Sequence, residues 1–321
     1  MISVVMPVYN AASLLGRAVA TVVSQQVDYE LLLVDDGSTD GSGSLCDALA
    51  AEHPAIRVVH KRNGGQASAR NVGMSLARGE YVYFMDDDDE LKPGALALLL
   101  RNMEASGADI SAATYIVGGA PSQPPRNHNE GRLLGNGEAM EMMMRREIDI
   151  YLWTKLYRSA FIAAHRLVFD EGRSEEDIVF NLKAFAQAQS VYWEPEPIYV
   201  YYERAASTYR TFALGNIEKH LSDIVYRTRL AEQMMKERYP SLMTIAVDQT
   251  LLYYFRALCI VAESGEAERF TSNADALAIW RYMKSHRQRL LTHRRRYGIS
   301  TAGAIAIACL PMPAYLRLKG R

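Results

Sequence analysis

Five consecutive acidic residues are the strongest candidate for chemistry in the chain. The run at residues 86–90 follows residues 81–85, whose aromatic and β-branched side chains are typical of a buried strand. Neighbouring carboxylates repel one another unless a cation lies among them, and Mg²⁺ or Mn²⁺ takes one or two carboxylates together with substrate phosphates. The alternative is a solvated acidic turn before the next helix, where negative charge is favourable. The run therefore predicts either a divalent-metal site or an acidic helix start.

A second acidic pair, Asp35 and Asp36, follows the apolar residues 31–34. The Asp36 carboxylate could accept the N3–H of uracil, a proton that cytosine does not carry there, and so select uridine. Tyr9, at the end of the first apolar segment, could stack on the base. The ordinary alternatives are a turn or helix-capping cluster for the aspartates and a half-buried aromatic for Tyr9.

Two glycines stand just before a helical pattern, in the segment 63–71 (NGGQASARN). The N-terminus of a helix with a flexible backbone suits contact with phosphate or ribose. Glycines in a loop are a weak signal alone, and Arg70 on this helix is more often a surface ion-pair partner. The segment indicates a ligand site only in combination with the acidic residues at the strand ends.

Three more acidic residues, Glu175, Glu176 and Asp177, precede an amphipathic helical pattern. A carboxylate with a pKa near ~4 is ionised at neutral pH. It could therefore take a proton from a reacting hydroxyl as a general base. The alternative is the ordinary acidity of a helix N-terminus.

Short apolar runs and amphipathic stretches alternate through the first 110 residues and would position these side chains. Strands are expected at residues 2–6, 31–34, 56–60 and 81–85, and helices at 13–25, 43–53, 67–77 and 93–106. This alternation predicts an α/β fold, with a mostly parallel, Rossmann-like sheet flanked by helices. Ligands of such sheets bind beyond the carboxyl ends of the strands, where the acidic and glycine-containing runs fall.

The rest of the chain is expected to be more helical. A long loop is predicted at 118–131, strand pieces at 190–193 and 198–202, and only helices after Leu214. We expect four regions: 1–110 and 111–210 as the two halves of one domain, a helical C-terminal region at 211–297, and an apolar and basic tail at 298–321.

Composition limits the class of protein. The 321 residues are 49% hydrophobic and 23% charged, which argues against wholesale disorder. Three widely spaced cysteines without a Cys-x-x-Cys pair indicate neither a disulfide framework nor a zinc site, and they favour the reducing cytoplasm. The N-terminus does not resemble a signal peptide, and we find no apolar stretch of the ~18 residues that a membrane span needs.

Charge is distributed unevenly although the net charge is only −1. Residues 281–321 contain ten Lys and Arg and no Asp or Glu, which leaves 26 basic and 37 acidic residues in the first 280. A basic segment beside an apolar run too short to span predicts contact with an anionic membrane surface. The alternative is a basic helix and an apolar helix packed on the body. No nucleic-acid partner is expected, because no nucleic-acid motif accompanies the basic residues.

Four blocks of sequence resemble the inverting family 2 glycosyltransferases of the GT-A fold. In chain order they are VVMPVYN, LLVDDGSTDGS, NGGQASARN and YVYFMDDDDEL. The likeness runs through residues 1–110 and recurs at 153–162, 172–185 and 199–210. The segment 172–185 resembles the Glu-Asp motif of the family, and 199–210 resembles its tyrosine-rich stretch ending in Arg-x-x-Ser.

The resemblance implies that residues 1–110 form the nucleotide-sugar-binding half of the domain and residues 111–210 its acceptor-binding half. It also implies a role for each matching residue. Seven residues would contact the donor nucleotide: Pro7, Tyr9, Asp36, Asn63, Arg70, Asp86 and Asp87. Asp86 and Asp88 would be the two carboxylates of the Asp-x-Asp motif, with Asp88 as the direct ligand of Mn²⁺ or Mg²⁺. Asp177 would be the catalytic base.

Two departures from the family pattern matter. The Gln-x-x-Arg-Trp motif of processive synthases is absent from the sequence, so addition of a single sugar is expected. The stretch 201–207 lacks the histidine that the family often carries. Contact with the diphosphate or the acceptor would then fall to Glu176, Arg204 and Ser207.

These observations predict an inverting hexosyl- or N-acetylhexosaminyltransferase. It would move one sugar from a UDP-sugar to a saccharide acceptor, expected to be lipid-linked, in cell-surface polysaccharide synthesis. It would be cytoplasmic and peripheral to the inner face of the cell membrane. The alternatives are a nucleotidyltransferase on a similar sheet and a non-catalytic sugar-nucleotide-binding protein.

Overall fold

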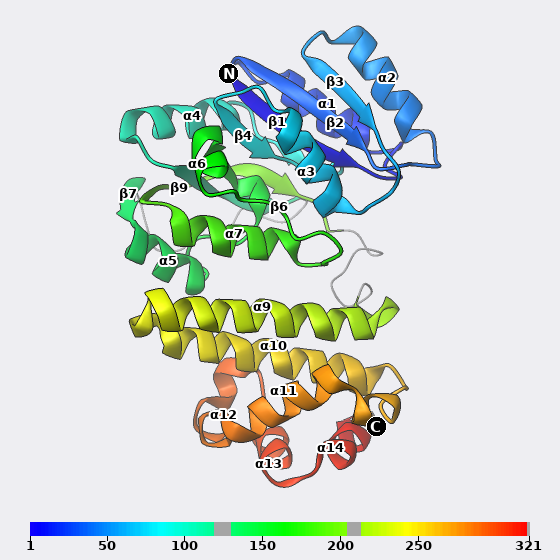
Figure 1. Cartoon of the computed structure of the whole chain (residues 1–321), viewed down its shortest axis with the longest axis vertical. Coiled ribbons are helices and arrows are strands. Elements are labelled where there is room, and N and C mark those ends of the chain that lie inside the picture. Colours follow the sequence, from blue (N-terminus) through cyan, green and yellow to red (C-terminus); the bar gives the residue numbers. More distant parts are fainter. Residues whose placement is uncertain (119–129, 204–212, 320–321) are drawn as a thin grey trace. The chain divides into compact units, whose positions relative to one another are not determined.

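The computed structural model describes residues 1–118, 130–203 and 213–319 (Figure 1). The chain divides into two compact units, Met1–Glu203 and Arg204–Arg321. The first unit is built from strands and helices, and the described part of the second contains only helices and 3-10 turns. The predicted α/β fold followed by a helical C-terminal region is therefore confirmed.

The first unit contains one sheet and its covering helices. Its strands are β1 (Ile2–Val8), β2 (Tyr29–Asp35), β3 (Ile56–His60), β4 (Tyr81–Phe84), β5 (Glu90–Leu91), β6 (Ile110–Val117), β7 (Arg132–Gly135), β8 (Lys155–Arg158) and β9 (Ser190–Tyr201). Its helices and one 3-10 turn are α1 (Leu15–Val23), α2 (Ser42–Glu52), α3 (Gln66–Leu76), α4 (Ala95–Ser106), α5 (Asn136–Met144), η1 (Leu152–Thr154), α6 (Ser159–Ala164) and α7 (Glu176–Gln187).

The strand order is β3-β2-β1-β4-β8-β6-β9-β5, with β7 paired to β9. Strands β1 to β4 pair in parallel, as the alternating pattern predicts, so their carboxyl ends lie at one edge. Beyond β4 the sheet is mixed, because β8 runs antiparallel to both β4 and β6. The polar residues that follow these strands therefore lie at the same edge, in the parallel half of the sheet.

Strand β9 is continuous where the sequence indicates two separate pieces. The interruption in the sequence pattern comes from Pro195 and Pro197, which have no backbone N–H to donate to a neighbouring strand. The register between β6 and β9 shifts on either side of Thr114, which pairs with Pro197. A bulge of this kind accommodates proline inside a strand. As a result β9 reaches the acidic segment, where it pairs with β5.

The buried side chains of β1 divide between the two faces of the sheet. Val4 and Met6 share a core cluster with buried residues of α1 and α4. Val5 lies against α3, where a Cβ atom added to Gly73 would lie 2.4 Å from Val5 Cγ1. Only glycine permits this close approach, which holds α3 tightly against the sheet.

The described part of the second unit is helical. Its elements are α9 (Ile217–Arg238), η2 (Pro240–Leu242), α10 (Met243–Glu263), η3 (Arg269–Ser272), α11 (Ala274–Ser285), α12 (Arg287–His293), η4 (Arg294–Tyr297), α13 (Thr301–Cys309) and α14 (Met312–Lys319).

One helix in the described part of the chain is long and apolar enough to cross a membrane. It spans Pro240–Glu263 and has a mean hydropathy of 1.4. By length and composition, the prediction that no segment qualifies was therefore wrong. In the structure 67% of the apolar window is buried, and Leu251, Leu258 and Val261 belong to the core cluster of the second unit. A helix at the centre of a helical core has this composition without spanning a membrane.

The apolar part of the predicted tail packs within the second unit. Its core cluster includes five side chains of α13 and α14: Ala304, Ile307, Met312, Tyr315 and Leu316. Ile305, on α13, remains 49% exposed. The packed arrangement is the alternative that the sequence left open.

Some of the basic residues in this region have internal partners. The buried carboxylate of Asp248 on α10 accepts hydrogen bonds from Arg289, Arg296 and Tyr297. The Arg296 Nη1 atom lies 2.8 Å from Asp248 Oδ2. These contacts join α12 and η4 to α10, so part of the positive charge stabilises the fold.

Candidate functional site

The loops after β1 and β2 are joined by side-chain hydrogen bonds. Asn10, whose φ is 51°, accepts the N–H of Thr39 on its Oδ1 atom at 2.8 Å. The N–H of Asn10 donates to Ser38 Oγ at 3.1 Å. Tyr9, next to this junction, is 51% exposed. The predicted stacking residue is therefore accessible at the carboxyl end of β1.

Asp36 organises the glycine-containing loop before α3. It is 3% exposed, and its Oδ1 atom accepts from Lys61 Nζ at 2.5 Å and from the N–H of Gly64 at 3.0 Å. Its Oδ2 atom accepts the N–H of Gly65 at 2.7 Å. A carboxylate offers about four acceptor positions, so the remaining capacity lies on Oδ2.

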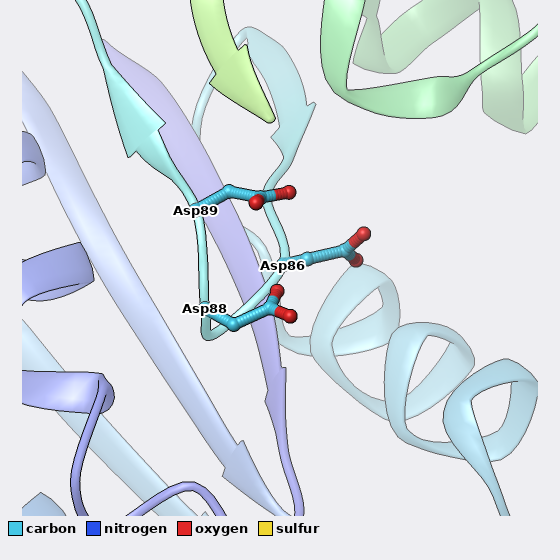
Figure 2. Close-up of side chains that lie close together, drawn as sticks. All are labelled: Asp86, Asp88 and Asp89. Carbon is cyan, nitrogen blue, oxygen red and sulfur yellow. The ribbon is translucent and has the colours of Figure 1, made fainter. Parts of the chain in front are cut away.

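Three aspartates of the acidic run lie close together (Figure 2). One carboxylate oxygen from each of Asp86, Asp88 and Asp89 lies within 4.8 Å of the others. Burial raises the pKa of Asp89 to about 8, and the neighbouring charge of Asp88 adds to this effect. A group of hard oxygen donors with excess negative charge fits a divalent cation such as Mg²⁺ or Mn²⁺.

Residues 86–90 form a turn, which we call the acidic turn, and hydrogen bonds of Asp89 join it to β9. It is 1% exposed, and its two oxygens accept the O–H of Tyr199 at 3.0 Å and the N–H of Tyr202 at 2.8 Å. The Tyr199 hydroxyl also accepts the N–H of Asp86 at 3.3 Å. Both ends of the turn are therefore tied to one tyrosine side chain.

Further contacts of the turn come from the loop after β1 and from α1. The Oδ2 atom of Asp87 accepts the N–H of Tyr9 at 3.1 Å. Arg17 donates from Nη2 to the carbonyl of Asp88 at 2.7 Å, and its Nε atom lies 3.1 Å from Glu90 Oε1. The turn is thus held by contacts from several segments of the chain, which fixes the direction of its carboxylates.

Arg70 connects the acidic turn to the start of α7. Its side chain is 4% exposed, and its Nη2 and Nη1 atoms lie 2.8 Å from Asp86 Oδ1 and 2.6 Å from Glu176 Oε1. Glu176 is also buried. The structure therefore brings two of the predicted motifs together, although they are far apart in the sequence.

Asp177 follows Glu176 at the N-terminus of α7. Burial raises its pKa to about 7, and the charge of Glu176 raises it further, whereas Arg70 opposes the shift. The expectation of an ordinary carboxyl pKa is wrong here, because the partly buried side chain lies beside the carboxylate of Glu176. A pKa near neutrality suits a group that takes up a proton at pH 7.

The remaining predicted site residues are placed as follows. Pro7 is buried within β1, where it pairs with Val34. Asn63 is exposed in the loop before α3. Arg204 and Ser207 lie outside the residues that the structure describes.

The sequence of the first unit matches a known family. The family described as Glycosyl transferase family 2 matches residues 3–170, just over half of the chain. The chain belongs to glycosyl transferase family 2. The matched segment contains both predicted metal ligands, whereas the candidate base, Asp177, lies beyond it.

Relatives of this glycosyltransferase support the same assignment. It is 30% identical to the uncharacterized glycosyltransferase EpsJ of Bacillus subtilis (strain 168) over 244 residues, which cover 74% of this chain and 67% of EpsJ. It is 27% identical to the succinoglycan biosynthesis protein ExoO of Rhizobium meliloti (strain 1021) over 227 residues, covering 68% of this chain and 65% of ExoO. The chain is therefore an enzyme, and the two non-glycosyltransferase alternatives are not retained.

A solved structure supports the fold of this glycosyltransferase. The crystal structure of TarS residues 1–349 of S. aureus, in complex with UDP-GlcNAc, superposes with a TM-score of 0.63 at 18% identity. The match covers 99% of this chain and 88% of that one. The predicted GT-A fold is confirmed by this likeness.

Sequence reasoning missed three residues that hold the acidic turn of this glycosyltransferase. Asp89 belongs to the acidic run, so its position was visible, but its burial against β9 was not. Arg17 and Tyr199 are 71 and 110 positions from their partners Asp88 and Asp89. No local pattern in the sequence connects residues at such distances.

Proposed function

We propose that this glycosyltransferase moves one hexosyl or N-acetylhexosaminyl group from a UDP-sugar to a saccharide acceptor, with inversion, in cell-surface polysaccharide synthesis. The observation that carries the proposal is the pairing of Arg70 with both Asp86 and Glu176. This pairing supports the proposal because Glu176 directly precedes the candidate base Asp177, and Asp86 is a candidate metal ligand. The likeness to ExoO and to the UDP-GlcNAc complex of TarS supports the polysaccharide and UDP-sugar assignments.

Asp177 would act as the general base. Its carboxylate takes the proton of the acceptor hydroxyl while that oxygen forms a bond to the anomeric carbon of the donor. The bond between the anomeric carbon and the UDP oxygen breaks, and its electron pair leaves with UDP. Because the hydroxyl attacks from the side opposite UDP, a single displacement inverts the configuration at that carbon.

Asp88 would hold the divalent ion directly, and Asp86 would complete the site. The bound Mn²⁺ or Mg²⁺ supplies positive charge that stabilises the charge developing on the diphosphate. Glu176 suits a role in orienting Arg70 better than direct contact with a diphosphate, because its own charge would repel that group. Arg204 and Ser207 remain candidates for such a contact.

The uridine would lie at the carboxyl ends of β1 and β2. Tyr9 offers an exposed ring for stacking on the base, and Asp36 retains acceptor capacity on Oδ2 for the N3–H of uracil. Asn63 is exposed in the loop that Asp36 holds. Pro7 shapes the end of β1 and would act through the backbone, because it is buried.

We further propose that the acceptor is lipid-linked and that the second unit contacts the inner face of the cell membrane. Exposed groups support this assignment: the apolar Ile305 on α13, and the basic Arg287 and Arg295 on α12 and η4. An apolar side chain with nearby arginines suits an anionic lipid surface.

Slow hydrolysis of donors without an acceptor tests the proposed reaction. The full-length protein is incubated with Mn²⁺ and a panel of UDP-hexoses and UDP-N-acetylhexosamines, and free UDP is measured. We expect release from at least one UDP-sugar, none after Asp88→Asn, and none from the matching GDP- or CDP-sugars. Turnover of only the GDP- or CDP-sugars would contradict the assignment of the donor.

A further inference from the structure

Aromatic side chains from three segments of the first unit stack around Trp153. Its ring is nearly parallel to those of Tyr151, Tyr199 and Tyr201, at centroid distances of 4.8, 4.4 and 5.8 Å and interplanar angles of 6°, 13° and 5°. Tyr115 stands edge-on to Trp153 at 4.7 Å and 88°. Edge-to-face and parallel contacts are both favourable arrangements of aromatic rings, so the ring planes are fixed.

The Tyr151 side of the stack is attached to the helix that begins with the candidate base. Asn181 on α7, which is fully buried, donates from Nδ2 to the carbonyl of Ile150 at 2.6 Å. The buried Lys155 donates from Nζ to the carbonyl of Tyr151 at 2.7 Å. Tyr151 is thus anchored to the helix whose first turn contains Asp177.

The Tyr201 side of the stack is attached to the acidic turn. Tyr199 and Tyr202, on either side of Tyr201, both donate hydrogen bonds to Asp89. Burial raises the pKa of Tyr201, and the charges of Asp89 and Asp88 raise it further, which agrees with this location. The stack therefore extends between the candidate base and the candidate metal ligands.

Tyr151 and Tyr201 are more exposed to solvent than the centre of the stack. Trp153 and Tyr199 are 5% and 0% exposed, whereas Tyr151 and Tyr201 are only half-buried. Within residues 1–118, 130–203 and 213–319, neither the Tyr151 nor the Tyr201 hydroxyl has a hydrogen-bond partner. An accessible ring with an available hydroxyl suits a ligand that has both apolar and polar groups.

We propose that Tyr151 and Tyr201 form the subsite for the acceptor sugar. A pyranose presents a face of C–H groups, which packs on the tyrosine rings, while hydroxyls at its edge bond to the phenol groups. The acceptor hydroxyl then lies between Asp177 and the donor held at the metal site. This inference rests on the proposed glycosyl transfer and names the surface that the acceptor occupies.

Saturation-transfer NMR on the full-length protein, with UDP and Mn²⁺ present, tests the subsite. The probes are methyl β-glucoside, methyl β-galactoside, methyl α-mannoside and methyl N-acetyl-β-glucosaminide. With irradiation of aromatic protein signals, we expect saturation to reach mainly the C–H protons on one face of at least one probe. Uniform saturation of every sugar proton, or none for any probe, would overturn the proposal.

Paired variants distinguish the contribution of each aromatic ring to sugar binding from that of its hydroxyl group. Tyr151→Leu and Tyr201→Leu remove a ring, and we expect about fivefold weaker binding of the probe, as is typical when an aromatic contact is lost. Tyr151→Phe and Tyr201→Phe keep the ring and should lose less affinity. Full binding by both leucine variants, or equal loss in the leucine and phenylalanine variants, would overturn the stacking role.

The proposed reaction is assessed separately through release of UDP without an acceptor. This assay on the wild-type protein does not depend on the acceptor subsite. The leucine variants should melt slightly below the wild type, because each loses one ring contact with Trp153. If wild-type protein binds a probe but releases no UDP, the proposed function fails while the saccharide subsite stands. If donor hydrolysis is normal and probe contact is absent, only the subsite fails.

Discussion

The Nη1 atom of Arg70 lies 2.6 Å from Oε1 of Glu176, although the two residues are 106 positions apart in the sequence. The same guanidinium donates from Nη2 to Asp86 at 2.8 Å. Because both contacts use one rigid, planar group, the acidic turn and the N-terminus of α7 hold a fixed relative position. The candidate base, Asp177, is adjacent to this bridge.

Removal of the Arg70 charge should shift the pH profile of the enzyme. The positive charge favours the ionised form of Asp177 and so lowers its pKa. Arg70→Met should therefore move the acidic limb of the kcat profile to higher pH, whereas Arg70→Lys should leave it near its original position. Arg70→Met should also destabilise the fold by about 3–5 kcal/mol, because the buried carboxylate of Glu176 and the partly exposed one of Asp86 lose their partner. Identical profiles for both variants would show that Arg70 does not act on the base.

Activity should rise with pH through about 7. The base must be ionised to accept a proton, and burial raises the pKa of Asp177 to about 7. At one unit below that pKa only about a tenth of the molecules are ionised, so kcat should fall about tenfold per unit below pH 6. Asp177→Asn should abolish transfer and leave UDP affinity in calorimetry within a few-fold. A flat profile between pH 5.5 and 8.5 would rule out this assignment.

A divalent ion should be required for transfer. We expect EDTA to reduce the rate at least about 100-fold and Mn²⁺ to restore it, since such ions contribute several kcal/mol to charge stabilisation. Asp88→Asn should lose this response with an unchanged melting temperature. The control is Asp28→Asn, whose side chain is 80% exposed and far in sequence from the acidic turn. Full activity in excess EDTA would remove the metal from the mechanism.

UDP should bind at least ~10-fold tighter than CDP, because a buried acceptor left unpaired costs about 1–3 kcal/mol. The Asp36 carboxylate can accept the N3–H of uracil, whereas N3 of cytosine is itself an acceptor. Asp36→Asn should remove most of this preference, and calorimetry with both nucleotides measures it. Its melting temperature reports separately on the loop that Asp36 holds through Lys61, Gly64 and Gly65. Equal affinities in the wild type would exclude Asp36 from base selection.

Two pairs of arginines in the second unit should behave differently. Arg287 and Arg295 are exposed, so changing both to Gln should weaken binding to anionic liposomes about 10-fold or more, at about 1 kcal/mol each. Arg289 and Arg296 pair with Asp248, so changing both to Gln should instead lower the melting temperature. Co-sedimentation at rising salt measures the first effect, because surface attraction is screened over ~10 Å at 0.1 M. Liposome binding unaffected by the first pair would contradict a membrane contact through these residues.

The local elements and the order of the polar strand ends could be predicted from the sequence alone. Strands β1 to β4 lie within a few residues of their predicted bounds, because alternating apolar runs and helical periodicity are local signals. The same locality explains why Tyr9, Asp36 and Asp88 could be singled out. Tyr9 and Asp36 directly follow β1 and β2, and Asp88 lies in the acidic run just beyond β4, in a sheet whose parallel strands have their carboxyl ends at one edge.

The interactions among these groups depend on the tertiary fold and could not be predicted from the sequence. The bridge from Arg70 to Glu176 and the contact of Asp89 with Tyr199 join residues more than 100 positions apart. The raised pKa of Asp177 depends on burial beneath segments that are distant in the sequence. The packing of α13 and α14 into the second core likewise depends on helices that no local pattern identifies as their partners. The burial of a side chain and its charge partners depend on all of its neighbours in space. A sequence pattern that predicts each helix or strand therefore does not predict which side chains become buried or paired.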